Sequence, residues 1–582
     1  MTDSIVILLF VDHYNLGWMI VISLLIGLLY NKFVYFFIPF KKLIEYIFPP
    51  QSDVDLNNFP SGMLVIPSLL RDEYDVKEIL AAVHSAAINN YPGELHIIAA
   101  IDGRSENLKQ YNELVKRMNI IKFADNIHLH VVHNEVRRGK QMAINAAIQY
   151  MRGLVAKGKL ACLPTIYFSF DADETMEDGS LRKLVERLMR RHPISKNYRT
   201  VVASQVCTPK ADMWKGWKSF FTIAGQNYLW VATGQMGFSF MLENVNILPY
   251  QILPGQLFAT WSEVLVQAPR LMGWLQTVKY TDAIRWWLGL GAPKFSDYTG
   301  ESLPEGLCGN TDDTSVMVVL AMSHWKNGKL SWDPMPTPLH AFGKMLWNLF
   351  VERTSVYEPN AKVYSFTPPK LKGLWNQRKR WMANRSELNG RFFKSFFFYW
   401  SAAVPFYTNF LQIIIPGLNT VLFFAMVPYS VYLSGGSVFS SFVLAFLLSY
   451  VIGILGVLVI YIFEPKKEQF THILLASLIP STWLFGIVFF NLVMIVGTFE
   501  DVFLFGLNVK FYTSNTLIRS RAQRIAIAYR ARRFLSMSWR SIRHGDVPFG
   551  WWWFGWYEKP EYGLTNGFTG WTKDNKSDYI LR

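Results

Sequence analysis

The chain has 582 residues, more than one ordinary domain needs. Hydrophobic residues make up 51% of it and charged residues only 17%, whereas typical soluble domains carry about 25% charged residues. This composition excludes disordered, collagen-like and coiled-coil chains, and it indicates a folded domain joined to membrane segments. Lys and Arg (58) outnumber Asp and Glu (43), which gives a net charge of +15. Such an excess is typical of proteins that meet acidic lipid, a phosphorylated substrate or nucleic acid.

The N-terminal segment, residues 1–55, contains an apolar run from Leu16 to Ile38. Although Asn31 and Lys32 interrupt this run, we predict that it crosses a membrane once and leads into a linker. It lacks the basic n-region and the small-residue cleavage site of a secretory signal peptide.

Residues 56–394 are predicted to form a cytoplasmic α/β domain, because short apolar runs alternate with helical patterns, which is typical of a mostly parallel sheet. The predicted strands are 63–67, 95–101, 127–132 and 165–170, and the predicted helices include 74–89, 141–151 and 314–324. Ligands bind such sheets beyond the carboxyl ends of the strands. Asp102, Asp171 and Asp173 lie at these ends.

Asp171-Ala172-Asp173 directly follows a buried strand pattern. Two carboxylates one residue apart can bind a divalent cation, and such hard oxygen ligands suit Mg²⁺ or Mn²⁺, which share their sites with phosphates. The alternative is a turn with two solvated aspartates. The position at the end of a strand favours the metal site.

Two further motifs carry chemistry. Asp312 and Asp313 precede a helical run, where they could cap the helix or supply a general base. A helix over 377–381 would place Gln377, Arg380 and Trp381 on one face. Arg380 could then meet phosphate oxygens and Trp381 could stack on a sugar. The alternative for this last motif is an amphipathic interfacial helix with ordinary basic anchors.

Two stretches toward the C-terminus carry no Asp, Glu, Lys or Arg: Ser395 to Phe463 and Phe470 to Phe499. A crossing helix needs about 20 apolar residues, so we predict a transmembrane helix bundle over 395–512.

The tail, residues 513–582, is basic and rich in Trp, and we expect it to lie at the inner membrane surface. If the α/β domain and the tail are both cytoplasmic, an even number of crossings must join them, and we predict four. The expected location is the plasma (inner) membrane, with several crossings.

The order of these motifs resembles that of the processive, membrane-embedded family 2 glycosyltransferases, which include cellulose, chitin and hyaluronan synthases. The shared pieces are Asp102-Gly103, Gly139-Lys140, Asp171-Ala-Asp173, the triplet ending at Asp313, and the QxxRW motif from Gln377 to Trp381. QxxRW followed at once by apolar segments is the most specific of them. The resemblance implies a GT-A-like (Rossmann-like) domain inserted between transmembrane helices.

The resemblance also implies roles for individual residues. Asp102, Lys140, Asp171 and Asp173 would bind the nucleotide sugar, the last two through Mg²⁺ or Mn²⁺. Asp313 would be the base that deprotonates the acceptor hydroxyl, with Asp312 beside the acceptor.

Gln377 and Arg380 would bind the donor diphosphate and Trp381 the acceptor sugar. Gly234 and Gly237 resemble the acceptor loop, and Trp571 and Lys573 resemble the gating loop. The triplet is Thr-Asp-Asp where cellulose synthases have Thr-Glu-Asp, and residues 325–350 read as an insertion.

The function expected from this resemblance is processive, inverting polymerisation of a β-linked polysaccharide, with export through the same chain. The partners would be a nucleotide-sugar donor, the growing polysaccharide and the bilayer, and an accessory subunit is an open option. A non-processive transferase that acts on a lipid carrier is the alternative enzyme. A channel or transporter with a regulatory cytoplasmic domain is the alternative from another class. Nucleic-acid binding is not expected, because the basic cluster borders the predicted membrane block.

The three cysteines, Cys162, Cys207 and Cys308, have neither a CxxC spacing nor the number that a disulfide framework needs. We expect small buried side chains in a reducing compartment.

Overall fold

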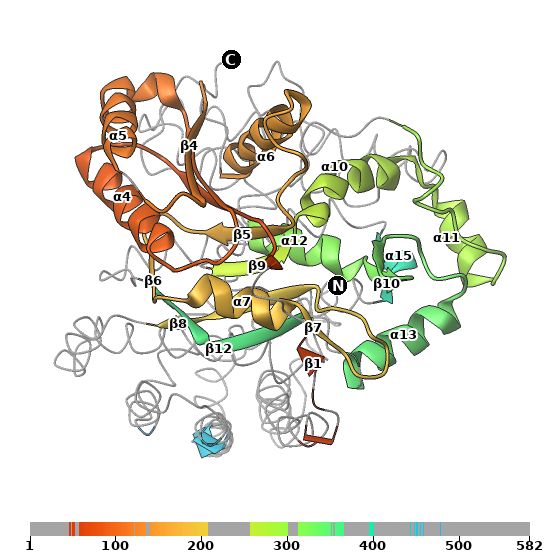
Figure 1. Cartoon of the computed structure of the whole chain (residues 1–582). Coiled ribbons are helices and arrows are strands. Elements are labelled where there is room, and N and C mark those ends of the chain that lie inside the picture. The colour runs from red at the N-terminus through yellow and green to blue at the C-terminus, as the bar shows by residue number, and fades with distance from the viewer. Residues whose placement is uncertain are drawn as a thin grey trace, which may run out of the picture.

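The computed structural model describes residues 58–121, 123–135, 140–207, 257–300, 312–350, 352, 355–365 and 395–400, and single residues or pairs within 43–52 and 443–478. Within these residues the main sheet has eight strands in the order β4-β3-β2-β5-β9-β8-β12-β6 (Figure 1). The strands are β2 (Gly62–Ser68), β3 (Leu95–Asp102), β4 (Ile127–Asn134), β5 (Ile166–Phe170), β6 (Thr175–Met176), β8 (Val201–Cys207), β9 (Leu257–Trp261) and β12 (Ser355–Tyr364).

The four strands predicted from the sequence are present and pair in parallel, β4 with β3, β3 with β2, and β2 with β5. The sheet is mostly parallel, as expected, but two strands of the opposite direction enter its other half. Strand β9 runs antiparallel to β5 and β8, and β12 is parallel to β8 but antiparallel to β6. The sheet is therefore mixed, because β9 and β6 enter against the direction of their neighbours.

Helices cover both faces of this sheet (Figure 1). They are α4 (Glu73–Ala87), α5 (Leu108–Ile120), α6 (Lys140–Ala156), α7 (Ser180–Leu188), α10 (Ser262–Thr277), α11 (Tyr280–Trp287), α12 (Asp312–Ala321), α13 (Pro338–Phe350) and the short α15 (Ser395–Phe398). One core contains side chains of α6, α10 and α12, and the other contains those of α4, α5 and α7.

Burial on both faces explains why the central strands are continuous apolar runs. In β2, Met63 and Val65 face the core with α6, whereas Leu64 and Ile66 face the core with α4. All seven residues of β2 and all eight of β3 are buried. Asp102 is thus the last residue of a buried strand, at the point where the chain leaves the core.

The segment read as an insertion forms a hairpin and a helix. The helix predicted over 314–324 ends earlier, at Ala321, and His324 begins strand β10 (His324–Lys326), which pairs with β11 (Lys329–Ser331). Helix α13 follows. A second two-stranded sheet pairs β1 (Gln51–Ser52) with β7 (Arg190–Arg191).

Buried Glu352, just after α13, connects this segment to the loop that follows β7. Its Oε1 accepts hydrogen bonds from Ser195 Oγ at 2.8 Å and Asn197 Nδ2 at 2.6 Å. Its Oε2 accepts from Lys344 Nζ at 2.9 Å and Trp347 Nε1 at 3.0 Å. Burial by itself would raise the pKa of Glu352, but the charge of Lys344 and these hydrogen bonds outweigh it and hold the pKa below its usual value.

Most of the predicted membrane segments, 16–38, 395–463 and 470–499, lie outside the described residues, as does the tail from 513 onward. In the part of the chain that is described, none of the helices combines the length and the apolar character that a bilayer crossing requires. The buried position expected for Cys162 is wrong, because its free thiol is exposed in the connection between α6 and β5.

We expect Glu352→Gln to lower the free energy of unfolding by about 3 kcal/mol, because the amide nitrogen would face two buried donors. A folded-state pKa below the unfolded value adds stability above the unfolded pKa, and this contribution is lost as the pH falls through the folded pKa. The difference between wild type and variant should therefore shrink in acid. Thermal unfolding of the purified chain at a series of pH values measures it.

Glu186→Gln is the matched control, since it breaks an i,i+4 pair with Arg182 that is partly exposed and worth about 0–1 kcal/mol. Equal losses in the two variants would contradict the structural role of Glu352.

Candidate functional site

Asp102 lies where β3 leaves the core. The residue is buried, and one of its carboxylate oxygens accepts a hydrogen bond from Asn134 Nδ2 at 3.2 Å. Asn134 is its register partner at the end of β4. Gly103 follows with φ of 80°, a left-handed conformation that a glycine adopts without strain. The two strand ends thus hold a carboxylate at the carboxyl edge of the sheet.

Three acidic residues gather immediately after β5. Asp171, Asp173 and Glu174, together called the acid turn, each offer an oxygen, and these oxygens lie within 4.8 Å of one another. Asp171 and Asp173 are partly or fully accessible, whereas Glu174 is buried. Carboxylate oxygens at this spacing are the donors that Mg²⁺ and Mn²⁺ use. The acid turn could therefore hold one divalent cation.

Lys140, the first residue of α6, forms an ion pair with Asp171 through its Nζ. Both side chains are about a quarter to a third exposed, at 26% and 30%. The pair brings together two residues that the sequence analysis placed at the nucleotide diphosphate. It also puts one positive charge directly beside the acid turn.

Glu174 was not predicted as a site residue. Burial raises the pKa of its carboxyl well above the usual value, and the charges of Asp171 and Asp173 raise it further. Ser365 donates a hydrogen bond to it, while Oε2 has no hydrogen-bond partner in the described part of the chain. The adjacent acid in Asp-Ala-Asp-Glu was the available signal, but its burial depends on β12, which comes far later in the sequence.

A fourth carboxyl group, Glu78 on α4, belongs to the same environment. Burial raises its pKa, and the charge of Asp173 contributes to the shift. Tyr74, one turn earlier on α4, hydrogen-bonds to Glu78, whose charge raises the pKa of the Tyr74 hydroxyl. The helical spacing of these two residues was visible in the sequence, but their proximity to Asp173 was not.

The connection from the acid turn to β12 is direct. Strand β6 begins two residues after Asp173 and pairs antiparallel with the end of β12, with Thr175 opposite Tyr364 and Met176 opposite Val363. The segment that leads toward Gln377 therefore starts beside the acid turn.

Asp312 and Asp313 begin helix α12. The body of this helix is buried in the same core as Tyr167 of β5 and Phe258 of β9. The helix thus begins two residues before the predicted start at Thr314, and the pair forms its first two residues.

The other residues predicted for the site lie outside the described part of the chain. They are Gly234, Gly237, Gln377, Arg380, Trp381, Trp571 and Lys573.

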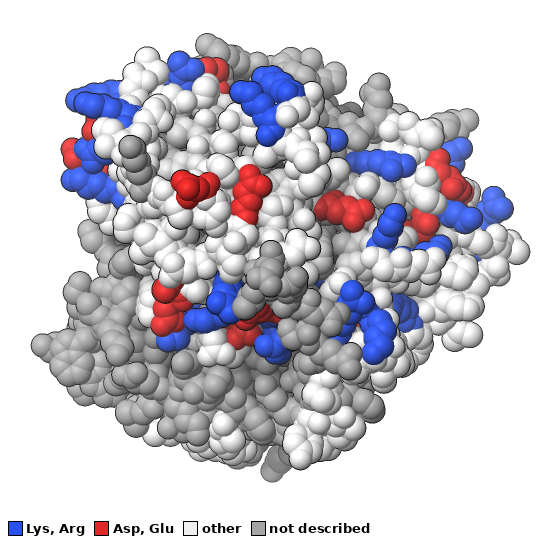
Figure 2. All heavy atoms as spheres, viewed as in Figure 1, with Lys and Arg blue, Asp and Glu red and all other residues white. Residues whose placement is uncertain are grey.

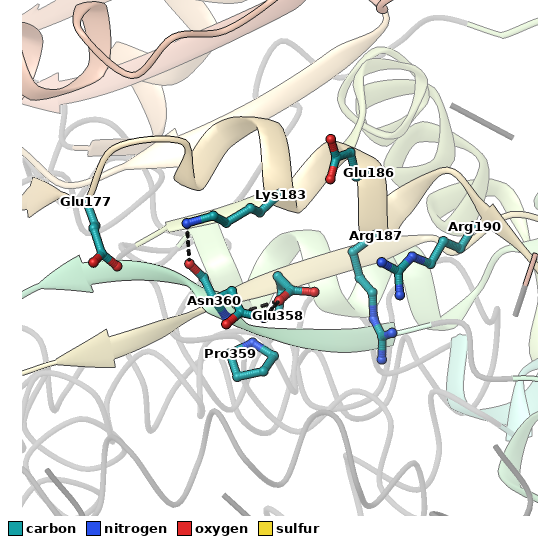
Figure 3. Close-up of a pocket in the computed structure, with 8 residues that line it drawn as sticks. All are labelled: Glu177, Lys183, Glu186, Arg187, Arg190, Glu358, Pro359 and Asn360. Carbon is teal, nitrogen blue, oxygen red and sulfur yellow. Dashed lines mark hydrogen bonds between the residues drawn. The ribbon is translucent and has the colours of Figure 1, made fainter. Parts of the chain in front are cut away.

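A cavity of about 440 Å³ lies between α7 and the bulged part of β12 (Figure 3). Its lining residues are Glu177, Lys183, Glu186, Arg187, Arg190, Glu358, Pro359 and Asn360. Lys183 reaches across it and donates to the main-chain oxygen of Asn360 at 3.0 Å (Figure 3). None of these residues was predicted from the sequence, and the mixed charges leave no single-sign surface for a diphosphate.

Accessible charges of both signs are interspersed on the surface. Figure 2 shows acidic and basic side chains near one another on one face, without a broad patch of either sign. The candidate donor site is therefore defined by the acid turn and Lys140, not by a broad charged patch among the described residues.

Residues 64–244, less than half of the chain, match the family model for glycosyl transferase family 2. The chain therefore contains a family 2 glycosyltransferase domain, and the α/β fold expected from the sequence is present in the described residues. No curated protein matches the chain.

The similar solved structures include two glycosyltransferases. One is the mannosyltransferase PcManGT from Pyrobaculum calidifontis in complex with GDP-Man and Mn²⁺, with 13% identity, a TM-score of 0.35, and coverage of 80% of this chain and 99% of that one. The other is GalNAc-T7 with UDP, GalNAc and Mn²⁺, with 18% identity, a TM-score of 0.16, and coverage of 25% of this chain and 23% of that one.

We expect Glu174→Gln to change how stability depends on pH. A carboxyl group with a raised folded-state pKa contributes its full stability below the unfolded pKa and loses it as the pH rises through the folded pKa. Glutamine stays neutral, so the variant should gain stability relative to wild type as the pH rises. Melting temperatures measured against pH in the presence of a chelator test this.

Glu113→Gln, at a carboxyl group 41% exposed on α5, is the control and should follow the wild-type profile. A Glu174→Gln profile that runs parallel to wild type would show that burial of this charge does not limit stability.

Proposed function

We propose that this protein is a processive, inverting glycosyltransferase. It polymerises a β-linked polysaccharide from a nucleotide sugar, with a UDP-sugar as the first candidate, and exports the product through its own membrane segments. The family 2 domain over 64–244 supports glycosyl transfer. The observation that carries the site is the acid turn, with Lys140 paired to Asp171.

Binding of the nucleotide sugar is explained by the charge of the site and by the type of its metal-ligating atoms. Asp171, Asp173 and Glu174 present only oxygen ligands, so the residues present fit Mg²⁺ or Mn²⁺. A bound cation would offset the negative charge of the nucleotide diphosphate as it leaves. Lys140 lies within reach of the same space and can exchange its contact with Asp171 for one with a phosphate oxygen.

The transfer step is a single displacement. Asp313 takes the proton of an acceptor hydroxyl, the hydroxyl oxygen bonds to the anomeric carbon, and the bond from that carbon to the diphosphate oxygen breaks. One base without a covalent intermediate gives inversion, so an α-linked donor yields a β-linked product. A general base contributes roughly 10²–10⁴-fold to such a step.

The proposed acceptor side lies toward the membrane. Gln377, Arg380 and Trp381 follow β12 in the sequence, and β12 ends beside the acid turn. Asp312, Gly234 and Gly237 complete the proposed acceptor contacts, and Trp571 and Lys573 are proposed for the gating loop. An aromatic ring such as that of Trp381 offers an apolar face to a sugar ring.

The proposed location is the plasma (inner) membrane, with the domain 56–394 and the tail 513–582 on the cytoplasmic side. The charge-free stretches within 395–512 support a helix bundle that receives the product.

Product size tests the proposal. Purified full-length protein is incubated with a panel of nucleotide sugars and either Mg²⁺ or Mn²⁺, and the products are separated by size and analysed for linkage. We expect long β-linked polymer from one donor or one donor pair. A lipid carrying a single sugar would favour the non-processive transferase, and ion flux without donor turnover would favour the channel.

Two variants separate binding from chemistry. Asp313→Asn should lower turnover by about 10²–10⁴-fold while donor binding stays near the wild-type value. Asp173→Ala should instead weaken metal-dependent donor binding. Titration of the nucleotide with and without metal, alongside turnover, gives both quantities. Near-normal polymerisation by Asp313→Asn would show that another group is the base.

A further inference from the structure

Two histidines and a glutamate meet at the start of β3 and β4, away from the acid turn. His96 and His128 are register partners on these adjacent parallel strands, and Glu94 immediately precedes β3. One potential ligand atom of each residue lies within 4.8 Å of the others. Neither the family match nor the proposed glycosyl transfer uses these three side chains, which we call the histidine site.

The distances fit a small metal ion. Glu94 Oε1 lies 3.3 Å from His96 Nε2 and 3.1 Å from His128 Nε2. Ligands about 2.0–2.1 Å from a tetrahedral zinc ion are about 3.3 Å apart. Both separations from the carboxylate are therefore already close to those of a coordination shell.

His96 supplies a buried ligand atom. Its side chain is 3% exposed, and Glu94 Oε1, at 3.3 Å, is paired with its Nε2 without the geometry of a full hydrogen bond. A buried polar atom without a hydrogen bond is costly. A metal ion between His96 and Glu94 would satisfy this nitrogen.

The other ring nitrogen of His96, Nδ1, is within hydrogen-bond distance of a second imidazole. His96 Nδ1 lies 3.1 Å from His130 Nε2, and His130 Nδ1 lies 3.2 Å from the Tyr150 hydroxyl on α6. If Nδ1–H donates to His130 and His130 donates to Tyr150, Nε2 of His96 keeps its lone pair. Metal-binding histidines use such a partner to fix their tautomer.

The two histidine ligands differ in accessibility, and the His96 side chain is only 3% exposed. His128 is more accessible, with its side chain 40% exposed. Its ring stacks on that of His96 at 4.8 Å between centroids, so it must turn about χ2 to aim at the same ion. Histidine χ2 is broad enough to permit this.

We propose that Glu94, His96 and His128 bind a divalent transition-metal ion, with zinc as the best-fitting member of the class and water as a fourth ligand. Two imidazoles and one carboxylate suit Zn²⁺, whereas Mg²⁺ prefers oxygen donors alone. The ion would join β4, the edge strand of the described sheet, to β3.

The proposed ion is distinct from the cation of the acid turn. Along β3 and β4, the pair Asp102 and Asn134 lies six positions after the pair His96 and His128. That is about 20 Å at the usual rise of a strand. The histidine site thus lies at the amino end of the strands and Asp102 at the carboxyl end, so the proposal stands independently of glycosyl transfer.

Metal binding by the purified full-length chain tests the proposal. The protein is stripped with a chelator, returned to buffer with millimolar Mg²⁺ to saturate oxygen sites, and titrated with Zn²⁺ by equilibrium dialysis. We expect one tightly bound equivalent. Co²⁺ in its place should give the visible absorption of a tetrahedral site with nitrogen and oxygen ligands.

His128→Asn and Glu94→Gln remove partly exposed ligands, so neither should prevent folding. Each should weaken zinc binding by more than the roughly 10–100-fold typical of losing an outer partner. His84→Asn, at an exposed histidine of α4, is the matched control and should bind zinc as wild type does.

Zinc should also raise the melting temperature of wild type and of His84→Asn, but not that of the two ligand variants. A zinc equivalent that persists unchanged in His128→Asn and Glu94→Gln, or wild type that binds no zinc under these conditions, overturns the proposal.

Discussion

The acid turn concentrates negative charge at the end of a buried sheet, and the neighbouring groups of the site reduce the resulting repulsion. Asp171, Asp173 and Glu174 have oxygens within 4.8 Å of one another, which is unfavourable unless a proton or a cation offsets the repulsion. Glu174 responds through a raised pKa, and Asp171 through its ion pair with Lys140. A divalent cation bound by these oxygens would offset the same repulsion.

The sheet makes this arrangement possible. Strand β5 is buried along its whole length, between β2 and β9. The acid turn follows it directly and therefore has a fixed position, next to Lys140 at the start of α6. Asp102 arrives at the same edge because β3 runs parallel to β2 and β5. The parallel strands β3, β4 and β5 therefore end at one edge of the sheet and bring Asp102, Asn134 and Asp171 to that edge, although these residues are far apart in the sequence.

The first half of this fold was predictable because parallel strands covered on both faces are uninterrupted apolar runs. Strands β6, β8, β9 and β12 were not predicted, and β9 and β6 are the two that run against the others. The run 257–261 is short and mostly apolar, and such a pattern does not distinguish a strand from part of a helix. The direction in which a strand enters a sheet also leaves no mark in its own residues.

The same limit applies to the sites. Asp171 and Asp173 were predicted because they follow a strand directly, and Lys140 because the Gly-Lys pair before a helix resembles the motif of family 2 glycosyltransferases. Glu174 was missed because Ser365, nearly two hundred residues later, forms part of its environment. His96 and His128 were read only as strand residues, since their meeting depends on the register of β3 with β4.

The short ladder between β6 and β12 has a geometric consequence for the chain that follows. Tyr364 is fixed opposite Thr175, next to the acid turn. Gln377 comes about a dozen residues later, so a fully stretched chain could carry it at most about 45 Å away, and a helical one about 20 Å. Wherever the intervening chain runs, the start of the QxxRW motif therefore lies within about 45 Å of Tyr364, which pairs beside the acid turn.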